Sequence, residues 1–346
     1  MAARVRAGVR ATVAAPLVEA VHASGHAVLA VRDLAVEVPL ERGVFRAVDG
    51  VGFELRPRET LGLVGESGSG KTMTSLALLR LLPEPPAKLA GGSVEFEGRD
   101  LLRLPERAVA DIRGRRIAMI FQEPMTSLNP VLSVGTQIAE PLRRHLGVGR
   151  REAAARAVEL LRHVGVPEPE RIAREYPHRL SGGMRQRVMI AIAIACGPVV
   201  LVADEPTTAL DVTIQAQILE LLNRLQEELG TAILLITHDL AVVAETAQRV
   251  AVMYAGRIVE TAPVEELFEA PRHPYTEGLL RSIPRITRQR PRHLPEIPGT
   301  VPGPGRLWQG CAFAPRCPRA AEVCRKQTPL LEPSGPGSAV ACWRPG

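Results

Sequence analysis

The sequence lacks an uninterrupted apolar run long enough to cross a membrane. Its longest apolar stretch lies between Val188 and Ala203, and a Gly-Pro pair interrupts it before two acidic residues close it. A spanning helix needs roughly 20 consecutive apolar residues, so we expect a helix end, a turn and a buried strand here. Residues 1–27 combine Ala and Arg without a continuous apolar segment, which argues against a secretory signal.

The sequence also lacks an internal repeat and any strong compositional bias. Apolar residues make up 46% of the chain and charged residues 23%, which excludes disorder of the whole chain. A length of 346 residues suits two domains, or one large domain with an appendage. We expect a flexible extension at 1–28, a main domain at 29–265 and a separate C-terminal region at 266–346.

Acidic residues are scarce at the two ends of the chain. Residues 272–346 hold 12 Lys or Arg against 4 Asp or Glu, and residues 1–27 hold 3 Arg and 1 Glu. The net charge of +6 therefore belongs to the ends, and the segment between them is acidic. A basic C-terminal region can face anionic lipid, nucleic acid or an acidic partner, or it can be a solvated surface.

Strand-like and helix-like patterns alternate along the main domain. We expect short buried strands and helical segments, in chain order, at Thr60–Val64 (strand), Lys71–Leu82 (helix), Arg115–Phe121 (strand), 134–174 (helical), Val199–Ala203 (strand) and Ala232–Thr237 (strand). This alternation predicts an α/β fold with a largely parallel sheet. Beyond Pro271 the composition shifts to Pro, Arg and Gly with little periodicity, which predicts an irregular extension.

A glycine-rich loop follows the first predicted buried strand. It matches the pattern G-x-x-x-x-G-K-[ST] and consists of Gly65, Glu66, Ser67, Gly68, Ser69, Gly70, Lys71 and Thr72. Backbone N–H groups of such a loop, and the start of the helix after it, bind phosphate oxygens. Lys71 is then expected to reach the β- and γ-phosphates, and the Thr72 hydroxyl to ligate Mg²⁺. The loop predicts ATP and Mg²⁺ as ligands.

Two carboxylates end a later apolar strand, at Asp204 and Glu205. Taken alone, such a pair is more often a loop entry or a helix cap. Downstream of a phosphate loop it suits phosphoryl chemistry, with Asp204 holding Mg²⁺ and Glu205 polarising the attacking water.

A Leu-Ser-Gly-Gly run at residues 180–183 opens an apolar helix and makes a second anion-binding helix start. With this run and the motifs around it, residues 29–265 resemble the ABC ATPases. The resemblance implies a P-loop NTPase fold with a mostly parallel core sheet, an antiparallel β subdomain and an α-helical signature subdomain. The irregular extension predicted from the composition lies beyond these residues and carries the C-terminal cysteines.

The resemblance assigns further site residues. Gln122 is similar to the glutamine that senses Mg²⁺ and contacts the channel subunit, and His238 is similar to the switch histidine at the γ-phosphate. The signature run is similar to residues that contact the nucleotide of the opposite subunit, and Asp211 to one that crosses the dimer interface. These ATP-binding residues are Ser181, Gly182, Gly183 and Asp211.

One position departs from the family pattern. The family usually stacks adenine on an aromatic residue ahead of the first core strand, where this chain has Val38. Phe45 is the alternative adenine contact, so the resemblance leaves this residue open.

The long stretch Phe121–Pro130 and the run His273–Thr276 resemble subunits of oligopeptide and dipeptide importers, a group that includes nickel importers. The resemblance implies a second, paralogous ATPase subunit, two membrane permease subunits and an extracytoplasmic solute-binding protein, at the cytoplasmic face of the membrane. The alternatives are the same ATPase subunit serving nickel or another small solute, and ABC ATPases that act on DNA or ribosomes. The short spacing from Lys71 to Ser181 and the single ATPase domain disfavour the latter, so no nucleic acid partner is expected.

Four of the five cysteines fall in the C-terminal region, and we call them the tail cysteines: Cys311, Cys317, Cys324 and Cys342. Clustered Cys in a Pro-rich segment that is poor in apolar residues suggest a soft-metal site. The spacing lacks the C-x2-C pairs common in zinc sites. The importer resemblance implies a [4Fe–4S] cluster, and Zn²⁺ and free or disulfide-bonded thiols remain alternatives. Cys196, in the apolar stretch, is expected to be an inert core thiol.

Overall fold

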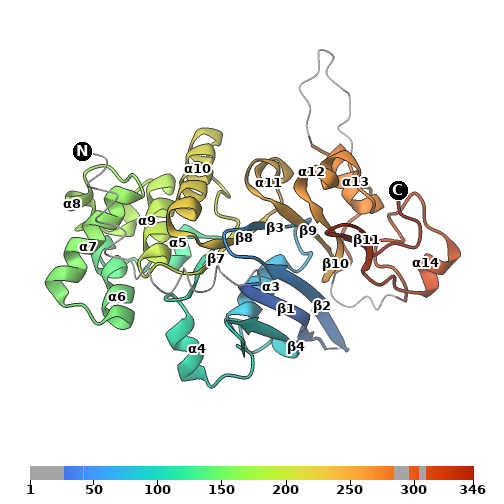
Figure 1. The fold of residues 1–346 in the computed structure, drawn as a ribbon, viewed down its shortest axis with the longest axis horizontal. Coiled ribbons are helices and arrows are strands. Elements are labelled where there is room, and N and C mark those ends of the chain that lie inside the picture. The colour runs from blue at the N-terminus through green and yellow to red at the C-terminus, as the bar shows by residue number, and fades with distance from the viewer. Residues whose placement is uncertain (1–26, 42, 284–295, 304–308) are drawn as a thin grey trace, which may run out of the picture. The chain divides into compact units, whose positions relative to one another are not determined.

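The computed structural model describes residues 27–41, 43–283, 296–303 and 309–346 (Figure 1). The chain divides into two compact units, which are described one at a time. Unit 1 comprises 1–29, 55–59 and 103–234, and unit 2 comprises 30–54, 60–102 and 235–346. The expected N-terminal extension lies almost entirely outside the described residues, and the structure does not test it.

Unit 2 contains a sheet with the strand order β11-β12-β10-β9-β3. β3 is buried at every position and pairs in parallel with β9, whereas β10 pairs antiparallel with β9 and with β12. The sheet of this unit is therefore mixed. Its strands are β3 (Thr60–Val64), β9 (Arg249–Tyr254), β10 (Arg257–Pro263), β11 (Glu332–Gly335) and β12 (Ser338–Val340).

A second sheet of unit 2 has the order β2-β1-β4-β5. Its β4 and β5 pair antiparallel, and apolar residues of β1 such as Leu34 and Val36 are fully buried at alternate positions, as expected for a strand with one face on a core. This sheet agrees with the β subdomain that the resemblance implies. Its strands are β1 (Leu29–Pro39), β2 (Val44–Leu55), β4 (Lys88–Phe96) and β5 (Arg99–Asp100).

The helices of unit 2 are short. α11 packs on β3, and α12 packs on β9, β10 and α11; α14 lies in the red C-terminal part of Figure 1. The helices are α3 (Lys71–Leu78), α11 (Leu240–Thr246), α12 (Val264–Glu269), α13 (Pro274–Arg281) and α14 (Glu322–Lys326).

Unit 1 contains the parallel pair β6 (Ile117–Ile120) and β7 (Val200–Asp204), and β8 (Ala232–Thr237) begins in it and ends in unit 2. The green helices α6, α7 and α9 of Figure 1 pack on one another in pairs, which agrees with a helical signature subdomain. The helices are α4 (Glu106–Ile112), α5 (Pro124–Ser127), α6 (Val134–Leu146), α7 (Arg150–His163), α8 (Pro169–Ile172), the 3-10 helix η1 (Pro177–Arg179), α9 (Gly182–Ile194) and α10 (Val212–Leu229).

The expected strands and helices are confirmed, with differences at their ends. α3 stops at Leu78 instead of Leu82, because Arg80 takes a left-handed φ of 53° and the Leu81 N–H donates to the Leu76 carbonyl at 2.8 Å. This hydrogen bond joins residues five positions apart, is typical of a helix C-terminus, and ends the helix one turn before the prolines that follow. Within the described part of the chain, no helix is both long and apolar enough to span a membrane.

The C-terminal region differs from the expected irregular extension. β12 pairs with β10, with Val340 opposite Glu260. Phe313 is 2% exposed and lies in the same apolar cluster as Val64 of β3 and Tyr254 of β9. The region thus shares a core with the sheet of unit 2. Because the sheet and α11 supply most of the buried apolar residues of this core, the region can pack despite its own low apolar content.

Candidate functional site

The glycine-rich loop joins β3 to α3 within unit 2. The Lys71 side chain is 5% exposed, and its Nζ donates to the carbonyls of Gly65 at 2.7 Å and Glu66 at 3.1 Å. Gly70 stands before the helix in the left-handed region, and the Thr74 N–H donates to its carbonyl at 2.9 Å. The loop is therefore closed around a buried ammonium at the start of α3, a place where backbone N–H groups favour anions.

Close packing explains why glycine begins this loop. Gly65 has a φ of 156°, and a Cβ there would lie 2.2 Å from the Met253 carbonyl oxygen on β9. Beside it, the Ser69 hydroxyl is fully buried and has no hydrogen-bond partner among the described residues. A buried polar group without a partner is rare in folded proteins, and a phosphate-bearing ligand in the loop would suit it.

The acidic pair lies in unit 1, where β7 ends. Asp204 is 1% exposed and is the last residue of the strand. Glu205 has a φ of 46°, which is uncommon for a residue other than glycine and is often found at functional sites. Gln122 Nε2 donates to Glu205 Oε2 at 3.1 Å, and Thr208 Oγ1 donates to the same oxygen at 2.8 Å. The structure thus brings together Gln122 and Glu205, which are 83 positions apart.

The signature run also lies in unit 1. Ser181 is the N-cap of α9, since its Oγ accepts from the Met184 N–H at 3.4 Å, and its side chain is exposed. Gly183 is required by packing, because a Cβ there would lie 2.8 Å from a methyl group of Ile214 on α10. Asp211 is exposed and caps α10 by accepting from the Ile214 N–H at 2.9 Å.

His238 follows β8 in unit 2 and is exposed. Its neighbour Asp239 starts α11 by accepting from the Ala241 N–H at 2.9 Å. Of the two half-buried candidates for the adenine contact, Val38 lies on β1 and Phe45 on β2. The roles assigned from the sequence to the loop, the signature run, Asp211 and His238 stay predictions.

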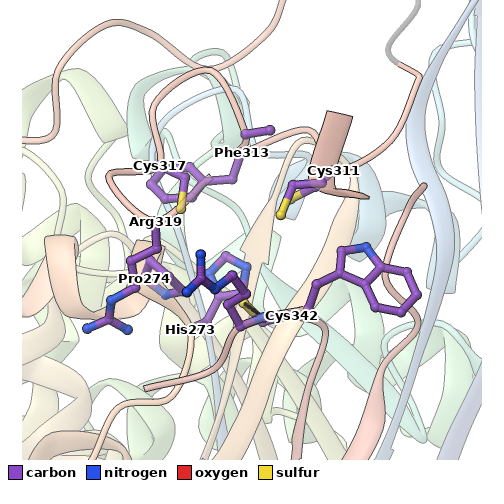
Figure 2. A pocket seen from close by; sticks show the side chains of 11 residues that line it. His273, Pro274, Cys311, Phe313, Cys317, Arg319 and Cys342 are labelled. Atoms are coloured by element: carbon purple, nitrogen blue, oxygen red, sulfur yellow. Dashed lines mark hydrogen bonds between the residues drawn. The ribbon is translucent and has the colours of Figure 1, made fainter. Parts of the chain in front are cut away.

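All four tail cysteines line one pocket in unit 2. The sulfur atoms of Cys311, Cys317 and Cys342 surround it in Figure 2, beside His273 and Arg319. Burial is the main reason why the pKa values of these three thiols are raised, and it lowers the pKa of His273 to about 4. The sequence prediction that these cysteines come together is thus supported.

The pocket does not have the geometry of a metal centre. Among the described residues, no group of three or more His, Cys, Asp or Glu side chains is arranged to hold a metal ion. The iron–sulfur cluster and the zinc ion therefore remain predictions that nothing in this arrangement supports beyond the shared pocket. Cys196 lies elsewhere, in unit 1, and is 9% exposed with its pKa raised to about 11 by burial.

Sequence reasoning missed two residues that contact the phosphate loop. The Tyr275 hydroxyl accepts from the Glu66 N–H at 2.8 Å, and Arg316 pairs with the Glu66 carboxylate at 2.7 Å. Tyr275 belongs to the conspicuous run His273–Thr276, which could have drawn attention to it. Arg316 carried no local signal, since one Arg among many in a basic segment does not stand out.

Comparisons with known proteins agree with this organisation. Residues 48–208 match the ABC transporter family model, and residues 259–324 match the family model of the oligopeptide/dipeptide transporter C-terminal region. A probable peptide ABC transporter ATP-binding protein of Sinorhizobium fredii is 57% identical over 91% of this chain and 94% of its own length. A putative peptide import ATP-binding protein of Brucella abortus is 54% identical over the same shares.

Solved structures show the same class of fold. A dimeric ATP-binding cassette in a post-hydrolysis state, bound to ADP and Pi, matches with a TM-score of 0.62 and 27% identity, over 68% of this chain and 98% of that one. The ABC subunit cbiO1 of Clostridium perfringens matches with a TM-score of 0.59 and 26% identity, over 70% and 91%. The fold and the site motifs define an ABC-type ATPase. This chain belongs to the ABC transporter family and carries the C-terminal region of its oligopeptide/dipeptide branch.

Proposed function

We propose that this chain is the ATP-hydrolysing subunit of an ABC importer that takes up di- and oligopeptides. The observation that carries the hydrolytic part is the carboxylate of Glu205, held by Gln122 and Thr208 at the end of β7. Two hydrogen bonds that fix the carboxylate in this way suit a group that must orient a water molecule. The peptide part is supported by the names of the relatives and by the C-terminal family match.

In the proposed reaction, the loop from Gly65 to Thr72 binds the triphosphate of ATP. The Lys71 ammonium exchanges its contacts with the loop carbonyls for phosphate oxygens, which are stronger acceptors because they are charged. Mg²⁺ arrives with ATP, and Thr72, Gln122 and Asp204 are its proposed ligands. Glu205 polarises the attacking water, and His238 acts at the γ-phosphate.

The exposed signature residues support a dimer. Ser181 and Asp211 both cap helices and are both exposed, so a second subunit could reach them without unfolding either helix. The proposed partners are a paralogous ATPase subunit, two membrane permease subunits and an extracytoplasmic solute-binding protein. The chain would then sit peripherally at the cytoplasmic face of the membrane, with no nucleic acid partner.

Reconstitution tests the proposal. The chain is co-expressed with its membrane partners, placed in vesicles with the solute-binding protein, and given MgATP with a labelled dipeptide mixture. ATP-dependent peptide uptake that a Lys71→Ala variant abolishes is the expected result. Uptake of Ni²⁺ with no response to peptides would favour the nickel alternative, and turnover that responds only to DNA or ribosomes would refute transport.

The tail cysteines are proposed to bind a soft metal centre, with a [4Fe–4S] cluster ahead of Zn²⁺; binding would have to draw together side chains that form no metal-holding group in the described residues. Thiolates are the usual ligands of such clusters, and the four thiols share one pocket that Arg319 and Arg344 also line. A cation in the pocket would favour the thiolate forms, and the two guanidinium groups would offset their negative charge. Bound there, the centre would supply cross-links that fix the tail, or a redox-active group.

A further inference from the structure

Two residues of the C-terminal region, Tyr275 and Arg316, hold Glu66, the second residue of the phosphate loop, and we call their contacts the grip on Glu66. The Tyr275 hydroxyl accepts from its backbone N–H at 2.8 Å, and the Arg316 guanidinium donates to both of its carboxylate oxygens, at 2.7 and 2.9 Å. Tyr275 is fully buried, and Arg316 is 8% exposed. These contacts join positions 209 and 250 residues apart, all within unit 2.

Arg316 uses every donor that a guanidinium has. Besides the two bonds to Glu66, it donates to the Pro298 carbonyl at 2.8 Å, the Ile297 carbonyl at 3.2 Å and the Tyr254 hydroxyl at 3.4 Å. Five acceptors thus match the five N–H groups of the side chain. The pairing with Glu66 is also the main reason why the pKa of Arg316 is raised. Lysine has three donors on one atom and could not reproduce this set.

The aromatic residues around Arg316 fix its position. Its guanidinium lies 5.8 Å from the ring centre of Tyr254 and 6.0 Å from that of Phe313. The Tyr254 and Tyr275 rings are 4.6 Å apart, and each packs on Phe313. The Arg316 side of the contact with Glu66 is therefore packed into a buried aromatic cluster.

Stability alone does not account for this ion pair. Burying the Arg316 guanidinium costs desolvation energy, whereas the side chain of its partner Glu66 is itself 30% exposed, and apolar residues of similar size often stabilise a core as well or better. What the pair adds is geometry, because it fixes the Glu66 side chain while Tyr275 fixes its peptide N–H. The carbonyl of the same residue accepts from Lys71 Nζ at 3.1 Å, so the grip acts directly on the groups that hold the phosphate-binding lysine.

We infer that Arg316 and Tyr275 are positioning residues of the phosphate loop, through which the C-terminal region controls the affinity for ATP. The inference rests on the proposed function, since it needs the loop to bind nucleotide. It assigns the C-terminal region a direct part in nucleotide binding, which neither its family description nor the names of the relatives mention. ATP affinity should respond to the grip, whereas chemistry at Glu205 should not.

Binding and turnover measurements on the full chain test this inference. Arg316→Met should weaken binding of a non-hydrolysable ATP analogue, followed by calorimetry, by about tenfold, since a charge-assisted pair is lost. In the assembled transporter its KM for ATP should rise by a similar factor, with kcat within about twofold of wild type. Arg257→Met is the matched control, because it breaks another ion pair of unit 2, with Asp49 at 2.6 Å, and should leave both values unchanged.

A double-mutant cycle shows whether Arg316 acts through Glu66. Adding Arg316→Met to Glu66→Ala should weaken binding no further than Glu66→Ala alone, because both oxygens that accept from Arg316 are already absent. If Arg316→Met does not fold, Tyr275→Phe keeps the test, since it removes only the oxygen that accepts from Glu66 and should weaken binding about threefold.

The outcomes separate two failures. A wild-type chain that does not bind the analogue refutes the proposed function itself. A wild-type chain that binds, together with unchanged affinity in Arg316→Met or Tyr275→Phe, refutes the inference alone. Additive losses in the cycle, or equal damage by Arg257→Met, would also refute it, because the effect would then be a general loss of structure.

Discussion

Replacing Glu205 by Gln should separate ATP binding from ATP hydrolysis. The amide side chain has the shape of the carboxylate, and its carbonyl oxygen can still accept from Gln122 and Thr208, the two donors 3.1 and 2.8 Å from Oε2. The local structure and nucleotide binding should therefore persist. What disappears is the negative charge that polarises water, and removing a general base costs about 10²–10⁴-fold in rate, or about 3–5 kcal/mol of barrier.

Thr208→Val provides the matched comparison for this prediction. It keeps the Glu205 carboxylate and removes one donor that orients it, a loss of about 1 kcal/mol. This should slow turnover about fivefold, far less than Glu205→Gln does. The assay is steady-state phosphate release by the assembled transporter at saturating MgATP, with binding of a non-hydrolysable analogue measured in parallel.

Two results would refute this reasoning. Turnover of Glu205→Gln within a few-fold of wild type would mean that another group activates the water. A larger loss in Thr208→Val than in Glu205→Gln would mean that the hydroxyl, and not the carboxylate, carries the chemistry.

Four further predictions follow from the described contacts. Ser181→Asn keeps an N-cap residue on α9 but enlarges the side chain. In a mixed dimer, this variant should lower the ATP occupancy of the site built on the partner's phosphate loop. A loss of ATP binding only at this chain's own phosphate loop would contradict the dimer model. Serine at any one tail cysteine should lower the iron content of anaerobically purified protein, while Cys196→Ser should leave the iron content unchanged. Colourless protein with stoichiometric zinc would show that the metal is zinc and not iron, and protein without metal would refute the proposal. Because burial raises the pKa of Cys196 from 9.0 to about 11, its thiolate fraction at pH 8 falls about 100-fold. Iodoacetamide labelling, read by mass spectrometry, should therefore be slower by that factor in native than in urea-unfolded protein, and it should speed up as the pH rises toward 11. Equal labelling rates in the two states would show that the thiol is not buried. Phe313→Ala should lower the free energy of unfolding by about 3–5 kcal/mol in urea titrations, since the ring is 2% exposed; a change below about 1 kcal/mol would mean that the C-terminal region does not share the core.

The local motifs could be predicted from the sequence because their structure depends on near neighbours. The loop from Gly65 to Thr72 is recognised by its own spacing, and the acidic pair Asp204 and Glu205 is recognised by the apolar strand before it. The contact of Gln122 with Glu205 was not visible in either segment, and the family resemblance gave Gln122 a role at Mg²⁺ without predicting this contact. A bond across 83 positions leaves no mark in the periodicity of either strand.

The C-terminal region was predicted least well, for a physical reason. Its apolar content is too low for a core of its own, so composition suggested a separate, irregular segment. In the structure, Phe313 and Tyr275 fill a core to which β3, β9, β10, α11 and α12 also contribute. Burial that is shared between distant segments cannot be read from the composition of one of them, and neither can the pairing of Arg316 with Glu66.

The grip on Glu66 has a consequence for how the chain is made. Arg316 comes 250 positions after Glu66, so a nascent chain emerges with its phosphate loop long before the residue that clamps it. At about 5–20 residues per second, the 250 positions between Glu66 and Arg316 take about 12–50 s to synthesise. During that time the loop can form its own turn around Lys71 but not its final anchorage. The C-terminal region thus completes the anchorage of the phosphate loop, and chains that end before Arg316 would leave the ribosome with a loop that holds ATP weakly.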